Sequence, residues 1–432
     1  MDTKCNQMEM EDFMQFDRSM SESVFVSNIK FLFGKLHLIW KLICAAVRGR
    51  LTQRGELRES AVEFEGRLMG VYSSAFTALL IQPGYKLGIV QWLADRQQRP
   101  ADAETIADEL GLKPRYVREW LDGMVEARIV ETDASNRLYW LPRHRANAMS
   151  SKGKPLLMKI ADIDTADCNP LAGFSMVLHE LYLDVKQDVE RCFVKDGPSG
   201  LPPSRYDNFY PTMDAMSTAL YTGQLLKTIL PNLYKGLQEQ LVGHLSHLDV
   251  ACGSGAVSRV LGASFPASQF KGVDTGSKSI ELGREKLRQA ALDNVELETM
   301  DASNLEPRWS GRFDWVSIFL SLHDMHAPAK ALQEAYRVLK TGGKLPLLEP
   351  FGHTNARYNA INPMKKVERM GGLYHCLPVS LSEEGGAGLG QGAGLEFTSQ
   401  LVRNAGFKLL SAHVGLGFSG LDFDVIVAEK PE

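Results

Sequence analysis

The sequence predicts an α/β protein in which a mainly helical module precedes a mostly parallel sheet. From His247 onward, short apolar runs alternate with segments that have the period of amphipathic helices. This alternation is typical of parallel strands joined by crossover helices. A glycine-containing turn follows the first apolar run and acidic residues end the next two, as in sheets that bind ligands at the carboxyl ends of their strands.

The chain of 432 residues is long enough for two domains and an extension. We predict an N-terminal extension at 1–60, a helical module at 61–150, a helical linker or cap at 151–235 and the sheet domain at 236–432. The net charge of −4, with 44% hydrophobic and 23% charged residues, is typical of a globular protein and gives no basic surface for nucleic acid. Six cysteines without CxxC spacing argue against a metal site and a disulfide framework, and they indicate a reducing, cytoplasmic location.

The N-terminal extension allows two interpretations. Val24–Val47 is strongly apolar, but Lys30, Lys35 and Lys41 interrupt any run of the roughly 20 apolar residues that a membrane-spanning helix needs. An amphipathic helix here could lie on a membrane surface as a peripheral contact. It could also pack on the protein's own domains, which is the interpretation we favour.

The next segment has the pattern of a winged helix. Helices are predicted at Arg67–Leu80 and Tyr85–Leu93 with a break at Gln82–Gly84, then at 100–112 and Lys113–Arg128, with hairpin strands at Ile129–Glu131 and Arg137–Leu141. Helices followed by a hairpin in this order resemble a winged helix, a module that many regulators use on DNA. Its DNA contacts would come from Lys113, Arg115 and Arg118.

A connecting region is predicted at Ser150–Pro203, followed by a helix at about Asp214–Leu230. An aromatic and methionine-rich stripe surrounds the start of this helix: Tyr206, Phe209, Tyr210, Met213 and Met216. The stripe lies directly before the first strand, so it could cover a ligand bound there. Ordinary core packing is the alternative.

The glycine turn after the first strand marks the predicted ligand site. Gly253 and Gly255 allow positive φ and close approach of a ligand, and the helix that follows offers unpaired N–H groups. A dinucleotide-binding turn would need a third glycine where Ser258 stands. A nucleoside without phosphates fits better, since Asp274 ends the second strand and could accept its ribose hydroxyls. Asp301 ends the third strand and could accept an adenine amino group.

These strand ends resemble the class I S-adenosylmethionine (SAM) methyltransferases. Their (D/E)xGxGxG loop, strand-2 acid and strand-3 aspartate match Asp249 to Gly255, Asp274 and Asp301-Ala302, with Ala251 in place of the first loop glycine. The resemblance implies a Rossmann-like domain with a seven-stranded, mostly parallel sheet and SAM as methyl donor. It places these residues around the cofactor: Asp249, Ala251, Cys252, Gly253, Gly255, Asp274, Asp301, Ala302 and Phe319. Backbone strain is expected at Ala251 if that position needs positive φ.

Seven strands and their crossover helices account for the rest of the domain. Strands are predicted to end at Val250 and to span Phe270–Asp274, Val295–Met300, Phe313–Ser321, Lys344–Glu349, Phe407–Val414 and Phe423–Ala428, with helices to Gly262 and at Lys278–Ala291, Pro328–Leu339 and Asn362–Met370. Pro346 cannot donate a ladder hydrogen bond, so we expect a local irregularity there.

The fourth strand leads into a loop with a candidate catalytic residue, His323. Methyl transfer to oxygen is an in-line displacement in which the acceptor must lose a proton, and a neutral histidine is a suitable base. His323-Asp324-Met325 is similar to the His-Asp-Trp of the plant O-methyltransferases, which implies that His323 is the general base and Glu349 a partner. The alternative is that His323 only hydrogen-bonds the backbone or the substrate.

A glycine-rich segment, 383–394, is predicted to form a mobile loop. With Tyr374, His375 and Cys376 it could line a substrate pocket, or it could be only a flexible connection. The C-x-P-x-S-L sequence before this segment, together with the winged helix, resembles a group of bacterial and invertebrate methyltransferase-domain proteins over residues 62–430.

The resemblance also bears on partners and function. In small-molecule methyltransferases, including the plant O-methyltransferases, a winged helix pairs two subunits, which implies a homodimer through 61–150. The predicted function is SAM-dependent methyl transfer to a small-molecule substrate, with oxygen as the expected acceptor. The alternative is a DNA-binding regulator whose second domain senses a SAM-like ligand. The missing third glycine disfavours an NAD-dependent oxidoreductase.

Overall fold

The computed structural model describes residues 59–150, 182–206, 210–233, 237–359, 364–415 and 423–432. The predicted helix within Val24–Val47 lies outside these residues. Within the described residues, no helix is long and apolar enough to cross a membrane.

The helical module is a winged helix with its own core. Its elements are α3 (Ala61–Lys86), α4 (Ile89–Asp95), α5 (Ala103–Leu110), α6 (Pro114–Glu126), β1 (Glu131–Thr132), β2 (Tyr139–Trp140) and α7 (Arg143–Met149). The side chain of Asp102 accepts the N–H of Thr105 at 2.7 Å and so caps α5, which ends at Gly111 with φ 66°. Ile106, Leu121 and Met124 are fully buried between the helices. β1 and β2 pair antiparallel, so the predicted hairpin is confirmed.

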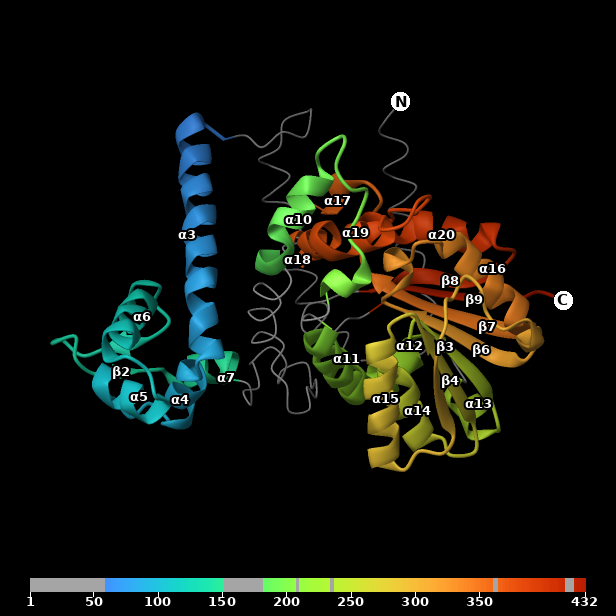
Figure 1. The fold of residues 1–432 in the computed structure, drawn as a ribbon, viewed down its shortest axis with the longest axis horizontal. Coiled ribbons are helices and arrows are strands. Elements are labelled where there is room, and N and C mark those ends of the chain that lie inside the picture. Colours follow the sequence, from blue (N-terminus) through green and yellow to red (C-terminus); the bar gives the residue numbers. More distant parts are fainter. Residues whose placement is uncertain (1–58, 151–181, 207–209, 234–236, 360–363, 416–422) are drawn as a thin grey trace, which may run out of the picture. The chain divides into compact units, whose positions relative to one another are not determined.

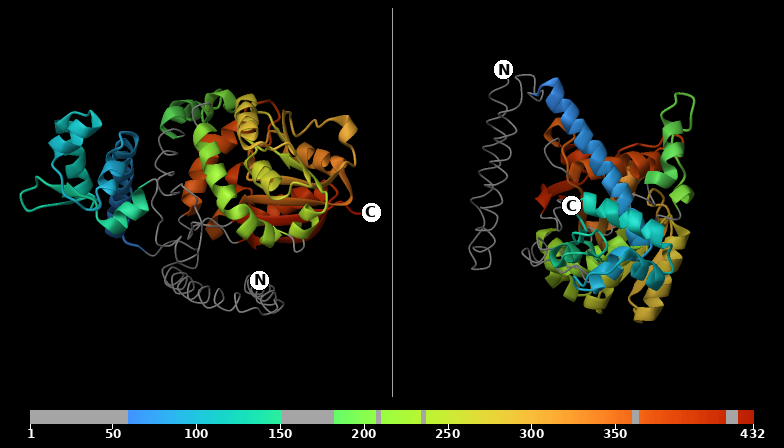
Figure 2. Two further views of the ribbon diagram at one scale, coloured as in Figure 1. Left: turned by 90° about the horizontal axis from the view of Figure 1, so that it is seen from below. Right: turned by 90° about the vertical axis from the view of Figure 1, so that its left-hand side faces the viewer.

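The predicted break at Gln82–Gly84 was wrong. Pro83 lies inside α3, which continues to Lys86 and is drawn as one unbroken helix in Figures 1 and 2. A Cβ at Gly84 would lie 2.1 Å from the Trp120 ring, and the indole N–H of Trp120 donates to Leu80 O at 2.7 Å. This packing holds the helix straight past the proline. The chain turns instead at Gly88, whose φ is 79°.

Several short helices follow the winged helix in the sequence and precede the first strand of the sheet. They are α10 (Asp184–Cys192), η2 (Pro203–Tyr206), α11 (Tyr210–Gln224), the π-helical turn η3 (Leu225–Ile229), α12 (Leu230–Leu233) and α13 (Leu237–Val242). The predicted helix at Asp214–Leu230 is therefore present but continuous with a π-helical turn. In the predicted connecting region, α10 buries Val185 and Val189 against Tyr206.

The second domain contains the predicted seven-stranded, mostly parallel sheet. Its strands are β3 (Ser246–Val250), β4 (Gln269–Asp274), β5 (Val295–Thr299), β6 (Phe313–Phe319), β7 (Leu339–Pro350), β8 (Lys408–Gly415) and β9 (Phe423–Glu429). Their order is β5-β4-β3-β6-β7-β9-β8, and β9 pairs antiparallel with both of its neighbours. β3, β4 and β5 follow one another toward one edge of the sheet, and the chain then returns to place β6 on the other side of β3. The direction in which strands are added therefore reverses between β3 and β6. In such sheets, ligands bind at this point.

Helices cover both faces of the sheet, as Figure 1 shows. On one face α11, α14 (Ala256–Ser264) and α15 (Ser277–Ala290) pack on a core that includes Leu297, Trp315 and Leu348. On the other face α16 (Pro328–Val338) and α20 (Gly394–Asn404) pack on a core that includes Val316 and Leu347. Neighbouring residues of one strand enter opposite cores, which explains why the central strands are apolar nearly throughout.

The irregularity expected at Pro346 occurs in the ladder with β6: Trp315 pairs with Lys344 and Ile318 with Leu347, and Pro346 has no partner between them. β7 continues through Pro346, which lies opposite Val427 in the antiparallel pair with β9. The register shift between β6 and β7 occurs earlier, between Phe313 and Trp315.

The glycine-rich segment is hydrogen-bonded to the rest of the domain. It follows α17 (Ala356–Asn359), α18 (Met364–Gly371), the π-helical turn η6 (Gly372–Cys376) and α19 (Leu377–Ser380), and it includes the short helix η7 (Gly390–Gly392). The N–H of Ala387 donates to His326 O, and the N–H of Gly388 donates to Ser380 Oγ, both at 3.0 Å. Gly394 has φ 79°, and a Cβ there would lie 2.3 Å from Thr354 N. The glycines thus allow close packing beside the carboxyl end of β7.

Candidate active site

Backbone strain marks the carboxyl ends of the two central strands. Ala251 follows β3 directly with φ 56°, and Leu320 follows β6 directly with φ 55°. Positive φ is unfavourable for residues with a Cβ and often occurs at functional sites. The strain predicted for Ala251 is confirmed, and Leu320 adds a second strained position that the sequence did not suggest.

Asp274 holds the glycine loop in place from the neighbouring strand. Its Oδ2 accepts the N–H of Gly253 and its Oδ1 accepts the N–H of Gly276, each at 2.8 Å. Burial raises the pKa of Asp274, and these two backbone hydrogen bonds oppose the rise. The acid at the end of β4 and the loop after β3 therefore form one unit.

The two loop glycines have different roles. Gly253 has φ 56°, and no described atom lies within 4 Å of the place where its Cβ would stand. Gly255 has φ 72°, and a Cβ there would lie 2.8 Å from the Leu297 side chain. Gly253 thus leaves space for a ligand to approach, whereas Gly255 is needed for packing against β5.

Asp249 lies inside the domain, with 2% of its surface exposed. Its carboxylate accepts the hydroxyls of Ser258 and Ser317 at 3.1 Å each, and Ser317 also contacts Nε2 of His247 at 2.8 Å. Burial raises the pKa of Asp249 to about 7, although the two hydroxyls lower it in part. These contacts give Asp249 the role of fixing the start of α14 to the sheet.

A second polar group, missed by the sequence analysis, supports the same loop from outside. The Ser254 hydroxyl donates to Asp214 of α11, and Asp214 also pairs with Lys286 of α15 at 2.5 Å. Arg259 of α14 donates to the Thr218 hydroxyl of α11 at 3.1 Å. The glycine loop is thereby tied to helices that lie on both sides of it in the sequence. No local motif could have revealed this, because the partners are distant in the chain.

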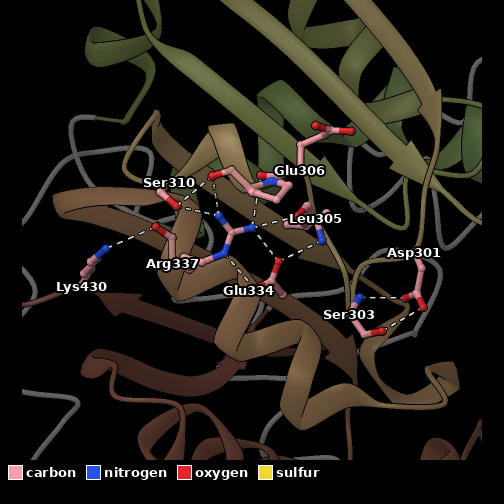
Figure 3. A network of polar contacts seen from close by, with 9 residues as sticks. Asp301, Ser303, Leu305, Glu306, Ser310, Glu334, Arg337 and Lys430 are labelled. Atoms are coloured by element: carbon pink, nitrogen blue, oxygen red, sulfur yellow. Dashed lines mark hydrogen bonds and ion pairs between the residues drawn. The ribbon is translucent and has the colours of Figure 1, made fainter.

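Asp301 lies in an exposed loop after β5. Its carboxylate accepts the N–H and the hydroxyl of Ser303, both at 2.8 Å. Figure 3 shows how the rest of this loop is fixed by Arg337 of α16, whose guanidinium donates to Leu305 O at 3.0 Å and to Ser310 Oγ at 2.7 Å. Arg337 also pairs with Glu334 at 2.7 Å. Arg337 therefore fixes the later part of the loop, and the bonds to Ser303 fix the carboxylate of Asp301.

The other predicted cofactor residues lie on the same edge. Phe319, the last residue of β6, is 7% exposed and stacks on Tyr221 of α11 with ring centroids 6.3 Å apart. Cys252 is half-buried, and its N–H donates to Val273 O at 3.0 Å. The structure brings the predicted residues together at the adjacent carboxyl ends of β3 to β6.

His323 is buried between two carboxylates. Its Nδ1 lies 2.5 Å from Glu349 Oε2, and its Nε2 lies 3.2 Å from Asp324 Oδ1. The other oxygen of Glu349 accepts the N–H groups of Ser321 and Leu322 at 3.2 and 3.0 Å, which fixes the loop that carries His323. Burial alone would lower the pKa of His323, but Asp324 and Glu349 reverse this effect and hold the pKa well above its usual value.

More groups surround His323 than the sequence predicted. His375 Nδ1 lies 3.9 Å from Asp324 Oδ2, and Cys376 interacts with both His323 and Asp324. The ring of Tyr206 packs on His375 with centroids 4.7 Å apart. A cavity of about 10 Å³, lined by His323, Glu349, Gln391 and Asp424 among others, adjoins the cluster and has room for about one water molecule.

Family models match both domains of the chain. Residues 248–347 match a methyltransferase domain, and residues 75–151 match the Rv2258c-like winged HTH domain. The chain thus contains a segment that matches a methyltransferase domain, preceded by a segment that matches a winged helix-turn-helix domain.

Curated relatives match part of the chain. A demethylmenaquinone methyltransferase from Listeria welshimeri is 36% identical over 103 residues, which are 24% of this chain and 43% of that protein. A demethylmenaquinone methyltransferase from Leptospira interrogans is 34% identical over 113 residues, 26% of this chain and 45% of that protein. The chain therefore spans less than half the length of these relatives.

Solved structures share the fold over most of the chain. The human N-acetylserotonin methyltransferase, solved in complex with SAM, has a TM-score of 0.59 and 15% identity, covering 87% of this chain and 99% of that one. The fold of this chain is thus shared by a protein of distant sequence.

Proposed function

We propose that this chain is a SAM-dependent methyltransferase that transfers a methyl group to a small-molecule acceptor, with oxygen as the acceptor atom. The matching methyltransferase domain supports the reaction class. The human enzyme that shares the fold was solved with SAM, which supports the methyl donor. When bound, SAM supplies an electrophilic sulfonium methyl group.

The observation that carries the proposal is the contact between Asp274 and the glycine loop. The carboxylate of Asp274 accepts two backbone N–H groups, and each of its oxygens has a second lone pair for a ribose hydroxyl. Gly253 leaves the adjoining space open, and Asp301 is exposed at the next strand end, where it can accept an adenine amino group. The arrangement fits a nucleoside that lies across the ends of β3, β4 and β5.

On the acceptor side, His323 is the proposed base. Glu349 fixes the imidazole through Nδ1, so Nε2 is the nitrogen that can take the acceptor's proton. Because Asp324 and Glu349 raise the pKa of His323, Nε2 must first give its proton to Asp324, which faces it, before it can accept the proton of an acceptor hydroxyl. An oxygen acceptor fits this geometry because its proton must leave as the methyl group arrives. The solved mitomycin 7-O-methyltransferase, 14% identical over 84% of this chain and 97% of that one with a TM-score of 0.61, is an oxygen-methylating neighbour.

Calorimetric titration with SAM and with S-adenosylhomocysteine tests the donor site. Replacing Asp274 with alanine should weaken binding of both by about 1 to 3 kcal/mol, since a hydrogen bond to a charged group is lost. Asp293→Ala is the matched control, because Asp293 is an exposed aspartate at the opposite end of β5 and should leave the affinity unchanged. Failure of the folded parent protein to bind either nucleoside would refute the proposal.

The base assignment has its own test. His323→Ala should lower turnover with an identified acceptor by about 100-fold or more, as expected for loss of a general base. Its affinity for SAM should remain close to that of the parent. An equal loss of turnover and of SAM affinity would show that His323 is structural.

The winged helix is proposed to pair two subunits in the cytoplasm. Helix α6 presents little free positive charge, because Arg115 pairs with Glu119 and Arg118 pairs with Glu104, the latter at 2.8 Å. These pairs disfavour DNA binding by this helix. A mass of twice the chain mass in light scattering would support the dimer. Binding of the protein to duplex DNA at moderate salt would instead favour the alternative function of a DNA-binding regulator.

A further inference from the structure

We infer that His323, Asp324 and Cys376 form a binding site for a divalent transition-metal ion of the zinc type. Within the described part of the chain, they are the group of histidine, cysteine and acidic side chains whose ligand atoms lie close enough to hold a metal, all within 4.8 Å of one another. His323 and Cys376 are buried and Asp324 is half-buried. Imidazole, thiolate and carboxylate are the ligand types that zinc prefers.

The spacing of the ligand atoms suits a tetrahedral ion. Zinc bonds of about 2.0 to 2.3 Å place neighbouring ligand atoms about 3.3 to 3.8 Å apart at the corners of a tetrahedron. His323 Nε2 and Asp324 Oδ1 are already 3.2 Å apart. The three ligand atoms lie within 4.8 Å of one another, so Cys376 Sγ would move closer to the other two as one ion binds, with the fourth position left for a water molecule or another ligand.

The groups behind the ligands provide independent support. Histidines that bind metals usually donate their second ring N–H to a carboxylate, and His323 Nδ1 lies 2.5 Å from Glu349. The Gln391 side-chain N–H donates to Cys376 Sγ at 3.4 Å, which would stabilise a thiolate. Both buried ligands therefore already have the partners that would orient them toward a metal.

The charges also allow the exchange of protons for a metal. Binding requires neutral imidazole and thiolate, so the metal displaces the protons of His323 and Cys376. The negative charges of the thiolate and of the Asp324 carboxylate then balance the two positive charges of the zinc ion. Because the metal uses the Nε2 lone pair, metal-bound His323 has no lone pair for an acceptor proton. The binding itself does not rest on the proposed methyl transfer.

Cobalt absorption spectroscopy tests the site without any enzymatic assay. Zinc is spectroscopically silent, but Co²⁺ bound to a thiolate gives a charge-transfer band in the near ultraviolet. One equivalent of Co²⁺ added to the full chain, with any purification tag removed and under reducing conditions, should produce this band. One equivalent of Zn²⁺ should abolish it.

Matched variants locate the site. Cys376→Ser should remove the band, whereas Cys192→Ser, which changes another cysteine far from the cluster in the sequence, should keep it. Glu349→Gln, which removes no ligand, should weaken Co²⁺ binding by about tenfold or more. Circular dichroism and melting curves must match the parent for each variant that is scored. Absence of the band in the parent, or an equal band in Cys376→Ser, would overturn the inference.

Discussion

The buried carboxyl of Asp249 should control the stability of the second domain as the pH changes. Its carboxylate is 2% exposed and accepts only two serine hydroxyls as side-chain donors, and burial raises its pKa to about 7 from an ordinary value of 3.8. The folded state therefore keeps this proton over a pH range in which the unfolded chain has lost it. The contribution to stability is fully present below about pH 4 and is lost as the pH rises through about 7.

The size of the effect follows from the shift. About three pKa units at about 1.4 kcal/mol each give a ceiling of about 4 kcal/mol above pH 7. Asp249→Asn cannot ionise, and its amide can still bond both serine hydroxyls. About 1 kcal/mol of this ceiling is already lost at pH 4.5, because the unfolded carboxyl is mostly ionised there. The free energy of unfolding of the variant relative to the parent should therefore rise by about 3 kcal/mol between pH 4.5 and pH 8.5.

Guanidinium unfolding between pH 4.5 and 8.5 measures the difference. Subtracting the parent curve from the variant curve removes the contributions of other titrating groups, such as His247, because both proteins share them. Asp293→Asn serves as control for the loss of a carboxyl, because Asp293 is exposed and its replacement should change the free energy of unfolding by less than about 0.5 kcal/mol. Parallel curves for Asp249→Asn and the parent would refute the reasoning.

Two further predictions concern the loops at the strand ends. Ala251→Gly should raise the free energy of unfolding by about 0.5 to 1 kcal/mol, because relief of the strain at φ 56° exceeds the entropy that glycine adds to the unfolded chain. The control Ala256→Gly, in the first turn of α14, should lower the free energy of unfolding. A loss of stability in both variants would contradict the strain argument. Arg337→Met should lower the free energy of unfolding by about 2 kcal/mol, because the carbonyls of Leu305 and Glu306 and the carboxylate of Glu334 lose a charged hydrogen-bond donor. The exposed Arg308→Met should change it by less than about 0.5 kcal/mol, and equal effects would mean that the network in Figure 3 does not stabilise the loop.

The sequence predicted the sheet well because its signals are local. Apolar runs, helical periods and the Gly253–Gly255 turn depend on neighbours in the chain, and the structure confirms the strands that they indicate. The helix break at Gln82–Gly84 was wrong because the packing of Trp120 on Gly84 overrides the local effect of Pro83. A tertiary contact of this kind leaves no periodic pattern.

The candidate site was predicted only in part. Asp274 and His323 could be placed because Asp274 ends a strand and His323 lies in the loop that follows another, and such ends meet at one edge of the sheet. The contacts of His323 with Cys376, and of Ser254 with Asp214, join segments far apart in the chain. The cysteine pattern indicated no metal site, since the candidate ligands are divided between the loop after β6 and the turn η6 and have no short-range spacing.

A crystal structure of the chain with S-adenosylhomocysteine would test the central claim most directly. The account predicts the nucleoside across the carboxyl ends of β3, β4 and β5, with its ribose hydroxyls on Asp274 and its amino-acid part beside Gly253. Density for the ligand at another place, or ribose hydroxyls directed away from Asp274, would contradict it.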